Sequence, residues 1–506
     1  MQVLKKYNNL IPLVLNALDM DSEDLIHKVF ETFNEFVEIK KVLGPHLPQI
    51  IEKAIIISAN TDFGVNLREV TILFLELIAE RYARLLVKNH GLNFVDKVVE
   101  VGFGIASEDH SLYDENDASP PEMALHMLYA FACNVPHEKV YPIFQKYLQQ
   151  FGTDKDEHKR AGATYILGYI ADPEACLDFI KRDLNPLTNF LIDRMQDNSF
   201  IVREAAGEAV GRFSEHVVPD FLDLHKKVMP CLIKVVRDMY DSKHEMTIQK
   251  SLFALNEFVQ NLDYDIKIYL DEVVTLLCKY AQQTNFGREV RYWALFALAN
   301  TIGVSQKKII PYQSQLLELF HHIITQGDSS ESQNVKGQAL MCVGKLASSC
   351  GKENFPTEAI NVFTEFAMTC LKHNKDNKLE LRETAITYFS DLSVLIKEEM
   401  QVIFEPVVTE ILTTLKKEDE FKETVEKKEE AKHFSLDSDS EGDLVGLDFD
   451  VSQLDEKTAA VNALGIICCH SPKCAQPKMK EILETFETLQ SYFHENVKFH
   501  VCLAYL

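Results

Sequence analysis

Apolar residues recur every three or four positions along almost the whole chain, which is the spacing of helices that bury one face. Stretches such as LNPLTNFLIDRM and DEVVTLLCKYA show this spacing clearly. Strand signals are scarce, because alternating apolar and polar runs are few and Asn-Gly hairpin turns are absent from the sequence. The pattern predicts an all-helical protein.

A second pattern is superimposed on the helical one. An acidic or amide residue lies six positions before a basic residue, and a helical stretch with small residues follows, at intervals of about forty-five residues. The pairs are Asp62 with Arg68, Asp154 with Arg160, Asp197 with Arg203, Asn285 with Arg291 and Asp376 with Arg382, and the series continues more weakly at Lys336, Lys457 and Lys498. A repeat of this length predicts a stack of similar units with one continuous core.

Each unit is predicted to contain two helices. The second is expected to begin at the repeated Asp or Asn, because the side chains of these residues cap helix N-termini. Small residues then allow neighbouring units to pack closely, which buries the apolar side that a single pair leaves open. We count about eleven second helices, near residues 22–38, 66–83, 121–133, 156–171, 199–215, 243–261, 285–304, 332–349, 376–396, 454–469 and 495–506.

The repeated acid and base would lie on the same turn of successive second helices. They would pair either within a repeat or with the next repeat, and both arrangements give a structural ladder along the stack. We favour this ladder over a role for the basic residues in binding a ligand.

The tenth unit is interrupted by a long acidic insert. We therefore divide the chain into repeats over residues 1–416, the insert over 417–453 and the remaining helices over 454–506, with the last repeat truncated. Residues 437–450 contain six acids and no base, so this stretch is expected to be solvated and mobile. The acids are Asp437, Asp439, Glu441, Asp443, Asp448 and Asp450. The stretch is either a tethered competitor for basic ligands or a solvated linker.

Ser438 and Ser440 in the insert are candidate phosphorylation sites. Glu441 and Asp443 lie three residues after them, which is the pattern that an acid-directed kinase such as casein kinase two prefers. Each phosphate would add about −1.5 to −2 charges near neutral pH. A chance match in a stretch rich in Ser and Asp is the alternative.

Charge and cysteine usage restrict the class of partner and the compartment. The chain has 52 basic and 77 acidic residues, a net charge of −25, which argues against nucleic-acid or anionic-membrane binding and towards basic partners. Solubility alone would explain the charge equally well. The 11 cysteines are scattered through apolar stretches, as expected of reduced thiols in an intracellular protein. No apolar run approaches the length of a membrane span, so membrane insertion is not expected.

Motifs of catalysis, cofactor binding and metal binding are incomplete. The glycines at 102 and 104 lack the third glycine and preceding strand of a dinucleotide site, and no Gly-x-Ser-x-Gly elbow is present. Cys468, Cys469, His470 and Cys474 form the densest group of metal-ligand types, but vicinal cysteines do not readily face one metal. We predict a protein that is not an enzyme and uses no cofactor or metal.

A candidate binding surface emerges when the second helices are aligned on their basic residue. Positions one, five and nine after it share a helix face, because residues four apart lie on one side of a helix. This stripe comprises Tyr165, Tyr169, Glu204, Glu208, Arg212, Phe253, Glu257, Tyr292, Phe296, Asn300, Glu383 and Asp391. Carboxylates among aromatic rings suit an extended basic peptide, since carboxylates pair with Lys and Arg and the rings contact their stems.

Within the stripe we predict that eight residues bind the basic partner: Tyr165, Tyr169, Glu204, Glu208, Glu257, Tyr292, Asn300 and Asp391. Phe253, Phe296 and the neighbouring Trp293 are expected instead to face the core. For the glutamates, a merely solvated face is an equally good interpretation.

The repeats and the insert together resemble a known family. Helices with the Asp/Asn-x5-Arg pattern resemble HEAT repeats. The segments RAGATYILGYIAD and VREAAGEAVGRFSEHVVPDF, followed by an acidic insert and LDEKTAAVNALG, resemble the importin-beta (karyopherin-beta) family and its importin-four subgroup. The resemblance covers nearly the whole chain and implies an all-α HEAT-repeat (armadillo-type) superhelical solenoid. The chain resembles an internal piece of such a protein, without the repeats at either end.

The resemblance also implies a function. Members of the family bind basic cargo such as histones or ribosomal proteins on the concave face, contact nuclear pore FG-repeat proteins, and release cargo to Ran-GTP while shuttling between cytoplasm and nucleus. The repeats that carry the family's main Ran contact lie outside this sequence, so a contact between this chain and the Ran GTPase stays open. Direct nucleic-acid binding is not expected.

Two rival functions use the same architecture. A static HEAT scaffold, such as a phosphatase regulatory subunit, would have short regular turns, and the insert at residues 417–453 counts against it. A microtubule-binding HEAT array would need basic loop edges, which the negative net charge disfavours.

Overall fold

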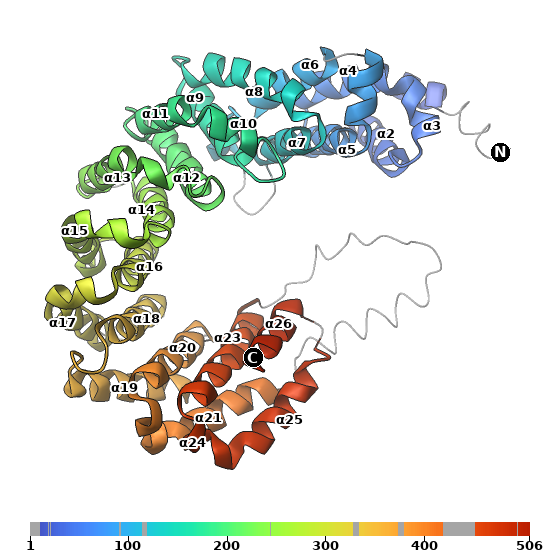
Figure 1. Cartoon of the computed structure of the whole chain (residues 1–506). Helices are drawn as coiled ribbons and strands as arrows, with labels where there is room; N and C mark the ends of the chain where they lie inside the picture. The colour runs from blue at the N-terminus through green and yellow to red at the C-terminus, as the bar shows by residue number, and fades with distance from the viewer. Residues whose placement is uncertain are drawn as a thin grey trace. The chain divides into compact units, whose positions relative to one another are not determined.

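The computed structural model describes residues 11–18, 20, 22–90, 93–113, 119–242, 244–326, 333–372, 379–417, 451–492 and 494–505. The chain forms two compact units, Met1–Leu262 and Asp263–Leu506. Each unit is a double layer in which the first helices of the repeats pack side by side and the second helices do the same (Figure 1).

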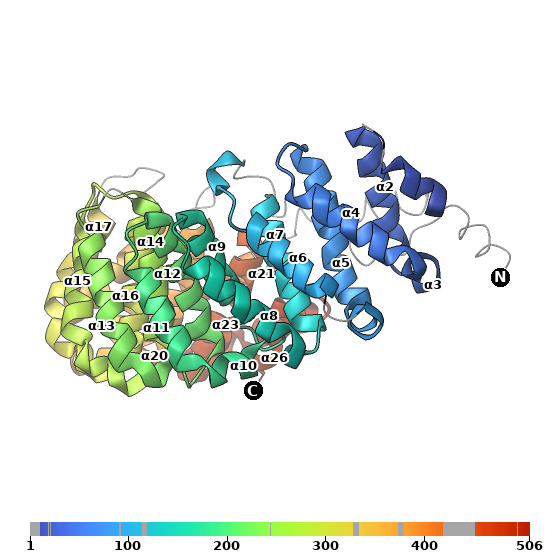
Figure 2. The same ribbon diagram turned by 90° about the horizontal axis from the view of Figure 1, so that it is seen from above.

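The N-terminal unit stacks six repeats. Its first helices are residues 11–17, α4 (Leu47–Ala59), α6 (Asn93–Ile105), α8 (His137–Gly152), α11 (Leu184–Met195) and α13 (His225–Met239). Its second helices are α2 (Glu23–Phe36), α5 (Val65–His90), α7 (Pro120–Asn134), α9 (Glu157–Ile170), α12 (Phe200–His216) and α14 (Glu245–Gln260). Short helices such as α3 (Lys40–Leu43) and α10 (Leu177–Arg182) connect them. Figure 2 shows α9, α12 and α14 running side by side.

The C-terminal unit stacks five repeats. Its first helices are α15 (Leu270–Gln282), α17 (Gln313–Thr325), α19 (Thr357–Leu371), α21 (Gln401–Lys416) and α25 (Met479–Leu489). Its second helices are α16 (Arg288–Ser305), α18 (Gln333–Cys350), α20 (Leu379–Ile396), α23 (Val451–His470) and α26 (Glu495–Ala504), with α24 (Pro472–Ala475) as a connector.

The predicted all-α HEAT-type solenoid is confirmed. The described residues contain a second helix at each of the eleven predicted places, and none of them lies in a strand. α5 extends to His90, beyond its predicted end at residue 83. None of the helices in the described ranges is both long enough and apolar enough to cross a membrane.

The expected helix caps at Asp154 and Asp197 are wrong. The N-cap of α9 is Asp156, whose carboxylate accepts a hydrogen bond from the His158 N–H, and α12 begins after Ser199. The repeated acids Asp154 and Asp197 lie two residues earlier and accept 3.0 Å bonds from the backbone N–H groups of Asp156 and Ser199. Each acid therefore orders the turn before the helix.

The insert falls largely outside the described residues. Its first residue, Lys417, follows α21, and α23 begins at Val451, three residues before the predicted boundary. The remaining insert, residues 418–450, lies outside the description, and with it the acids from Asp437 to Asp450 and the serines Ser438 and Ser440.

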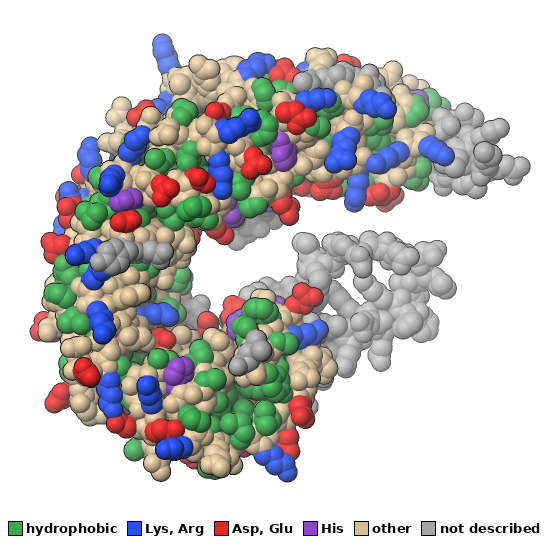
Figure 3. Space-filling model, in the orientation of Figure 1, with side chains coloured by type: hydrophobic (Ala, Val, Ile, Leu, Met, Phe, Trp, Pro, Cys, Tyr) green, Lys and Arg blue, Asp and Glu red, His purple; other side chains and the backbone are tan. Residues whose placement is uncertain are grey.

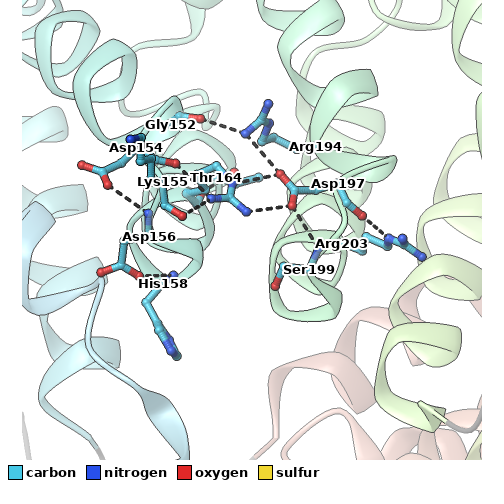
Figure 4. A network of polar contacts seen from close by, with 11 residues as sticks. Gly152, Asp154, Lys155, Asp156, His158, Thr164, Arg194, Asp197, Ser199 and Arg203 are labelled. Atoms are coloured by element: carbon cyan, nitrogen blue, oxygen red, sulfur yellow. Dashed lines mark hydrogen bonds and ion pairs between the residues drawn. The ribbon is translucent and has the colours of Figure 1, made fainter.

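Arg160 and Asp197 form one rung of the ladder that the sequence predicts. The Arg160 guanidinium donates from Nε and Nη2 to the two carboxylate oxygens of Asp197 in the next repeat, each at 2.9 Å (Figure 4). Its Nη1 donates to the backbone oxygens of Asp154 and Lys155, also at 2.9 Å. The base thus pairs with the acid of the next repeat and with the backbone of its own turn.

Other repeats vary this rung. The Arg68 guanidinium pairs with Glu108, and Arg382 Nε lies 2.8 Å from Glu456 Oε1. Arg291 donates to the neutral Gln326 Oε1 at 3.3 Å. These four bases thus all have partners within the fold, and three of them pair with an acid.

Glycines set the spacing between α12 and α14. A Cβ atom on Gly207 would lie 2.7 Å from the backbone oxygen of Lys250, and one on Gly211 would overlap the ring of Phe253. A side chain at either position would force the helices apart. The small residues of the repeat therefore fix which side chains of α12 and α14 meet.

Candidate functional site

The predicted site residues are distributed over both units. Tyr165 and Tyr169 lie on α9, Glu204 and Glu208 on α12, and Glu257 on α14, all in the N-terminal unit. The C-terminal unit carries Tyr292 and Asn300 on α16 and Asp391 on α20. We name the first group, with Thr247 and Lys250 of α14 and Arg212 of α12, the acidic–aromatic patch.

The tyrosines of the patch are half-buried among rings of neighbouring helices. The ring of Tyr165 lies 6.1 Å from that of His110, and the ring of Tyr169 lies 5.9 Å from that of His126. Burial raises the pKa of both phenols, so both stay neutral at physiological pH. They offer apolar ring surface and a polar hydroxyl.

Glu204, like Glu257, has no ion pair with a cationic side chain among the described residues. It is half-buried, and its Oε1 accepts a 2.7 Å hydrogen bond from the Thr247 hydroxyl. Burial raises the pKa of Glu204, while the Thr247 bond and the nearby His244 and Lys250 lower it less. A cation that docked here would compensate the desolvation of this carboxylate through a favourable charge interaction.

Glu208, one turn further along α12, has two cationic partners. Its Oε2 lies 2.8 Å from Lys250 Nζ, and its Oε1 lies 3.4 Å from Arg212 Nε. The Arg212 guanidinium also stacks on the ring of Tyr169, with its Cζ atom 3.9 Å from the ring centroid. Glu208 and Tyr169 are therefore already occupied by cations of the chain itself.

Glu257 does not join the carboxylates on α12. It lies near the end of α14, where its Oε1 accepts a 2.9 Å bond from Asn256 and its Oε2 accepts a bond from Gln260. Burial raises its pKa, and the charge of Glu215 adds to this effect. Both of its carboxylate oxygens already accept hydrogen bonds from side chains of α14, so Glu257 is a weaker candidate than Glu204 for binding a ligand.

In the C-terminal unit the predicted residues form an aromatic cluster and a separate acid. The ring of Tyr292 stacks on Phe296 with a centroid distance of 6.1 Å, and Trp293 meets Phe296 edge-on at 5.7 Å. Asp391 lies on α20, where burial raises its pKa and Lys345 Nζ is 4.0 Å from its Oδ2. This acid, like Glu208, has a lysine of the chain beside it.

Two sequence interpretations need correction. Phe253, Phe296 and Trp293 are half-buried, although the sequence favoured the core for them. The ring of Phe253 lies over Gly211 of α12, in the space that a side chain at this position would fill. Lys250 and Thr247 were missed, and a spacing of about forty-three residues from Glu208 and Glu204 is the signal that would have found them.

The arrangement is suited to binding a peptide by charge and ring contacts. Acidic and basic side chains are intermixed over the surface seen in Figure 3, so the net negative charge is not one continuous field. Across the described ranges no three His, Cys, Asp or Glu side chains are grouped as metal ligands.

Comparison with known proteins finds similarity to importins. No family model matches the chain. Importin subunit beta-3 of Saccharomyces cerevisiae is 24% identical over 369 residues, which are 69% of this chain and 33% of that protein. Importin-4 of Mus musculus is 24% identical over 428 residues, 80% of this chain and 38% of that protein. The chain thus spans little more than a third of the length of these relatives.

Solved structures share the fold. Kap121p bound to Pho4p superposes with a TM-score of 0.81 at 20% identity, over 98% of this chain and 49% of that chain. Kap121p bound to RanGTP and Kap121p bound to Nup53p match with TM-scores of 0.69 and 0.80 at 20% and 21% identity, over 99% and 98% of this chain and 50% and 48% of theirs. The chain is thus similar in sequence to importins, and it shares the stack of HEAT helix pairs of the Kap121p structures.

Proposed function

We propose that the chain is part of a nuclear import receptor and binds a basic segment of its cargo on the second helices of the N-terminal unit. The importins it resembles and the complex of Kap121p with Pho4p support this class of function. Histones and ribosomal proteins are the cargo types we propose, because both are rich in Lys and Arg. The receptor would act without catalysis or a cofactor, in cytoplasm and nucleus.

The proposal rests on the half-buried carboxylate of Glu204, which forms no ion pair among the described residues. A half-buried carboxylate without a cationic partner is a costly feature unless a ligand compensates it. Tyr165 lies one repeat away, and its half-buried ring would contact the aliphatic stem of a lysine or arginine held by Glu204. Tyr165 packs against Val202 and Ala205 of α12, so its ring lies beside the helix that carries Glu204.

We predict that reversing both charges, Glu204→Lys with Glu208→Lys, weakens binding of a fluorescent lysine-rich peptide by about tenfold to a hundredfold. Anisotropy titration measures the affinity. The matched control is Glu138→Lys with Asp193→Lys, which changes the same charge at exposed positions of α8 and α11. Equal affinities of the site and control variants would contradict the proposed site.

We propose that a groove between α8 and α11 binds nuclear pore FG-repeat proteins. The groove has a volume of about 560 Å³ and an apolar lining that includes Leu148, Leu187 and Phe190. Asp183 at its edge accepts hydrogen bonds from Tyr141 at 3.0 Å and Gln145 at 2.6 Å. The groove would bury a phenylalanine ring of such a repeat, and burying this side chain stabilises the complex by about 1.5–3 kcal/mol.

Leu187→Gln is predicted to weaken binding of a Phe-Gly repeat peptide by about tenfold, because the ring then meets a polar side chain. Leu112→Gln is the control, since Leu112 is an exposed leucine away from the groove. Biosensor titration with the peptide immobilised measures both. If the two variants bind equally, the groove is not the FG site.

Ran-GTP would release the cargo in the intact receptor, and we propose this step for the parent protein, as supported by the complex of Kap121p with RanGTP. The acidic insert at residues 417–453 would compete for basic ligands, and phosphate on Ser438 and Ser440 would strengthen it. Phosphate mapping by mass spectrometry after treatment with an acid-directed kinase tests the modification.

A further inference from the structure

Arg212 and Lys250 occupy the patch in the way a basic ligand would. Arg212 covers the ring face of Tyr169 at 3.9 Å and pairs with Glu208, while Lys250 reaches Glu208 from the next repeat at 2.8 Å. A guanidinium on an aromatic ring and an ammonium on a carboxylate are the contacts expected of bound arginine and lysine side chains. Two cations of the chain itself therefore occupy positions at which the patch would bind a basic ligand.

The fold holds these cations in place. Gly207 lets the backbone of α14 approach α12 beside Lys250, and the next residue of α12 is the Glu208 that receives the ammonium group. Arg212 lies one turn after Glu208 on the same helix, at the spacing that favours side-chain pairing. Glu208 is only 19% exposed, so its two partners are shielded in part from water and salt.

We propose that Arg212 and Lys250 are resident cations that a basic cargo segment must displace from Glu208 and Tyr169. This inference rests on the proposed function, because it concerns the same peptide site. Glu204, which has no cation of its own among the described residues, is the point of first contact. A ligand with one basic residue would dock at Glu204 but would not displace the resident pair.

The resident cations would reduce the affinity that a ligand gains from a second basic residue close to the first. A second cation of the ligand exchanges with Lys250 or Arg212 at Glu208, so few new ion pairs are gained overall. Binding through exchange depends weakly on salt, since ion pairs are lost as well as formed. Sites with unpaired carboxylates would show a steeper salt dependence.

The test compares wild type with the double variant Arg212→Gln and Lys250→Met, using a fluorescent peptide with three lysines and a matched peptide with one. The double variant is expected to bind the three-lysine peptide about tenfold more tightly, with a steeper loss of affinity between low and high salt, and to bind the one-lysine peptide with nearly unchanged affinity. The matched control is Lys227→Met with Lys234→Met, which removes two cations of α13 that contact the neutral Asn185 at 3.1 Å and Gln196 at 3.0 Å.

The control is expected to change affinity less than roughly twofold, because surface charges beyond a Debye length are largely screened. If the double variant behaves like this control, the resident-cation inference is overturned. Circular dichroism and hydrogen exchange establish that each variant is folded. A variant that loses folding is replaced by Arg212→Lys, which keeps the charge but not the planar group, and by Lys250→Met alone.

Failure of the inference can be told apart from failure of the proposed function. If Glu204→Gln with Glu208→Gln leaves wild-type affinity unchanged, the peptide binds elsewhere and both proposals fall. If that variant weakens binding while removal of Arg212 and Lys250 does not tighten it, only the resident-cation inference falls. Tight binding that appears only after their removal would support it most directly.

Discussion

Asp197→Ala is expected to make the amides of α9 and α12 exchange about a hundredfold faster, a loss of about 3 kcal/mol of local stability. The side chain is 9% exposed and holds Arg160 through two 2.9 Å contacts and Arg194 at 3.3 Å. Removing it leaves two partly buried guanidinium groups without their anion. Arg160 keeps its hydrogen bonds to the backbone oxygens of Asp154 and Lys155. The expected loss of stability therefore lies at the lower end of the range for a broken buried ion pair.

Asp154→Ala is the matched control, because Asp154 holds the same place in the preceding repeat. Its carboxylate pairs with the exposed Lys159 at 3.3 Å and has no arginine from the helix before it among the described residues. We expect its exchange rates to change by no more than roughly twofold. Comparable effects at Asp154 and Asp197 would show that the turn, and not the rung, stabilises the stack.

The pH dependence gives an independent check on the rung. Burial alone would raise the pKa of Asp197, but the bonds from Arg160 and the Ser199 N–H outweigh it and lower the pKa. A lowered pKa in the folded state means that the carboxylate stabilises the fold above its unfolded pKa of about 3.9 and stops doing so as the pH falls further. The difference between wild type and Asp197→Ala should therefore shrink below about pH 4.

Much of the fold was predictable because most repeats use the same apolar spacing and place a base near the start of the second helix. Apolar spacing gives the helices, and the base near the start of each second helix gives their register. The ladder was predicted as well, but the sequence left open which acid each base would choose. Arg160 pairs with Asp197 because the next repeat places that acid beside it, whereas Asp154 offers its backbone oxygen.

The helix starts could not be read from the acids for the same reason. Asp197 is a good N-cap residue by type, but its carboxylate is taken by Arg160 and by the Ser199 N–H. At Asp197 an interaction with the neighbouring repeat thus replaces the local capping preference, whereas α9 is capped by Asp156, a second acid two residues after Asp154. The division into two units between Leu262 and Asp263 was also not predicted, since the repeat continues on both sides of it.

The site was predictable as a face but not in its details. Positions four residues apart identified Glu204 and Glu208, and the structure places both on α12. The two glutamates differ in their partners on α14, because Thr247 donates to Glu204 and Lys250 pairs with Glu208. That register depends on the close approach at Gly207, which spacing within one helix does not encode.

Breaking the ion pair between Arg382 and Glu456 is expected to have the largest effect in the C-terminal unit. The two side chains are 8% and 7% exposed, and Arg382 also donates to Thr414 Oγ1 at 2.9 Å and to the Leu371 backbone oxygen. The contact joins α20 to the helix that follows the insert, with support from α19 and α21. Glu456→Leu or Arg382→Met alone should cost about 3–5 kcal/mol, because each leaves a buried charge unpaired.

The double variant Arg382→Met with Glu456→Leu decides between charge and packing. Apolar side chains at both positions remove both buried charges, so most of the lost stability should return, with a coupling of at least about 2 kcal/mol between the two sites. Hydrogen exchange of α20 and α23 measures the three variants against wild type. Fluorescence of Trp293, the single tryptophan of the chain, reports whether the rest of the C-terminal unit stays folded. Losses that simply add in the double variant would mean that packing around each side chain, and not the ion pair, holds α23 on α20.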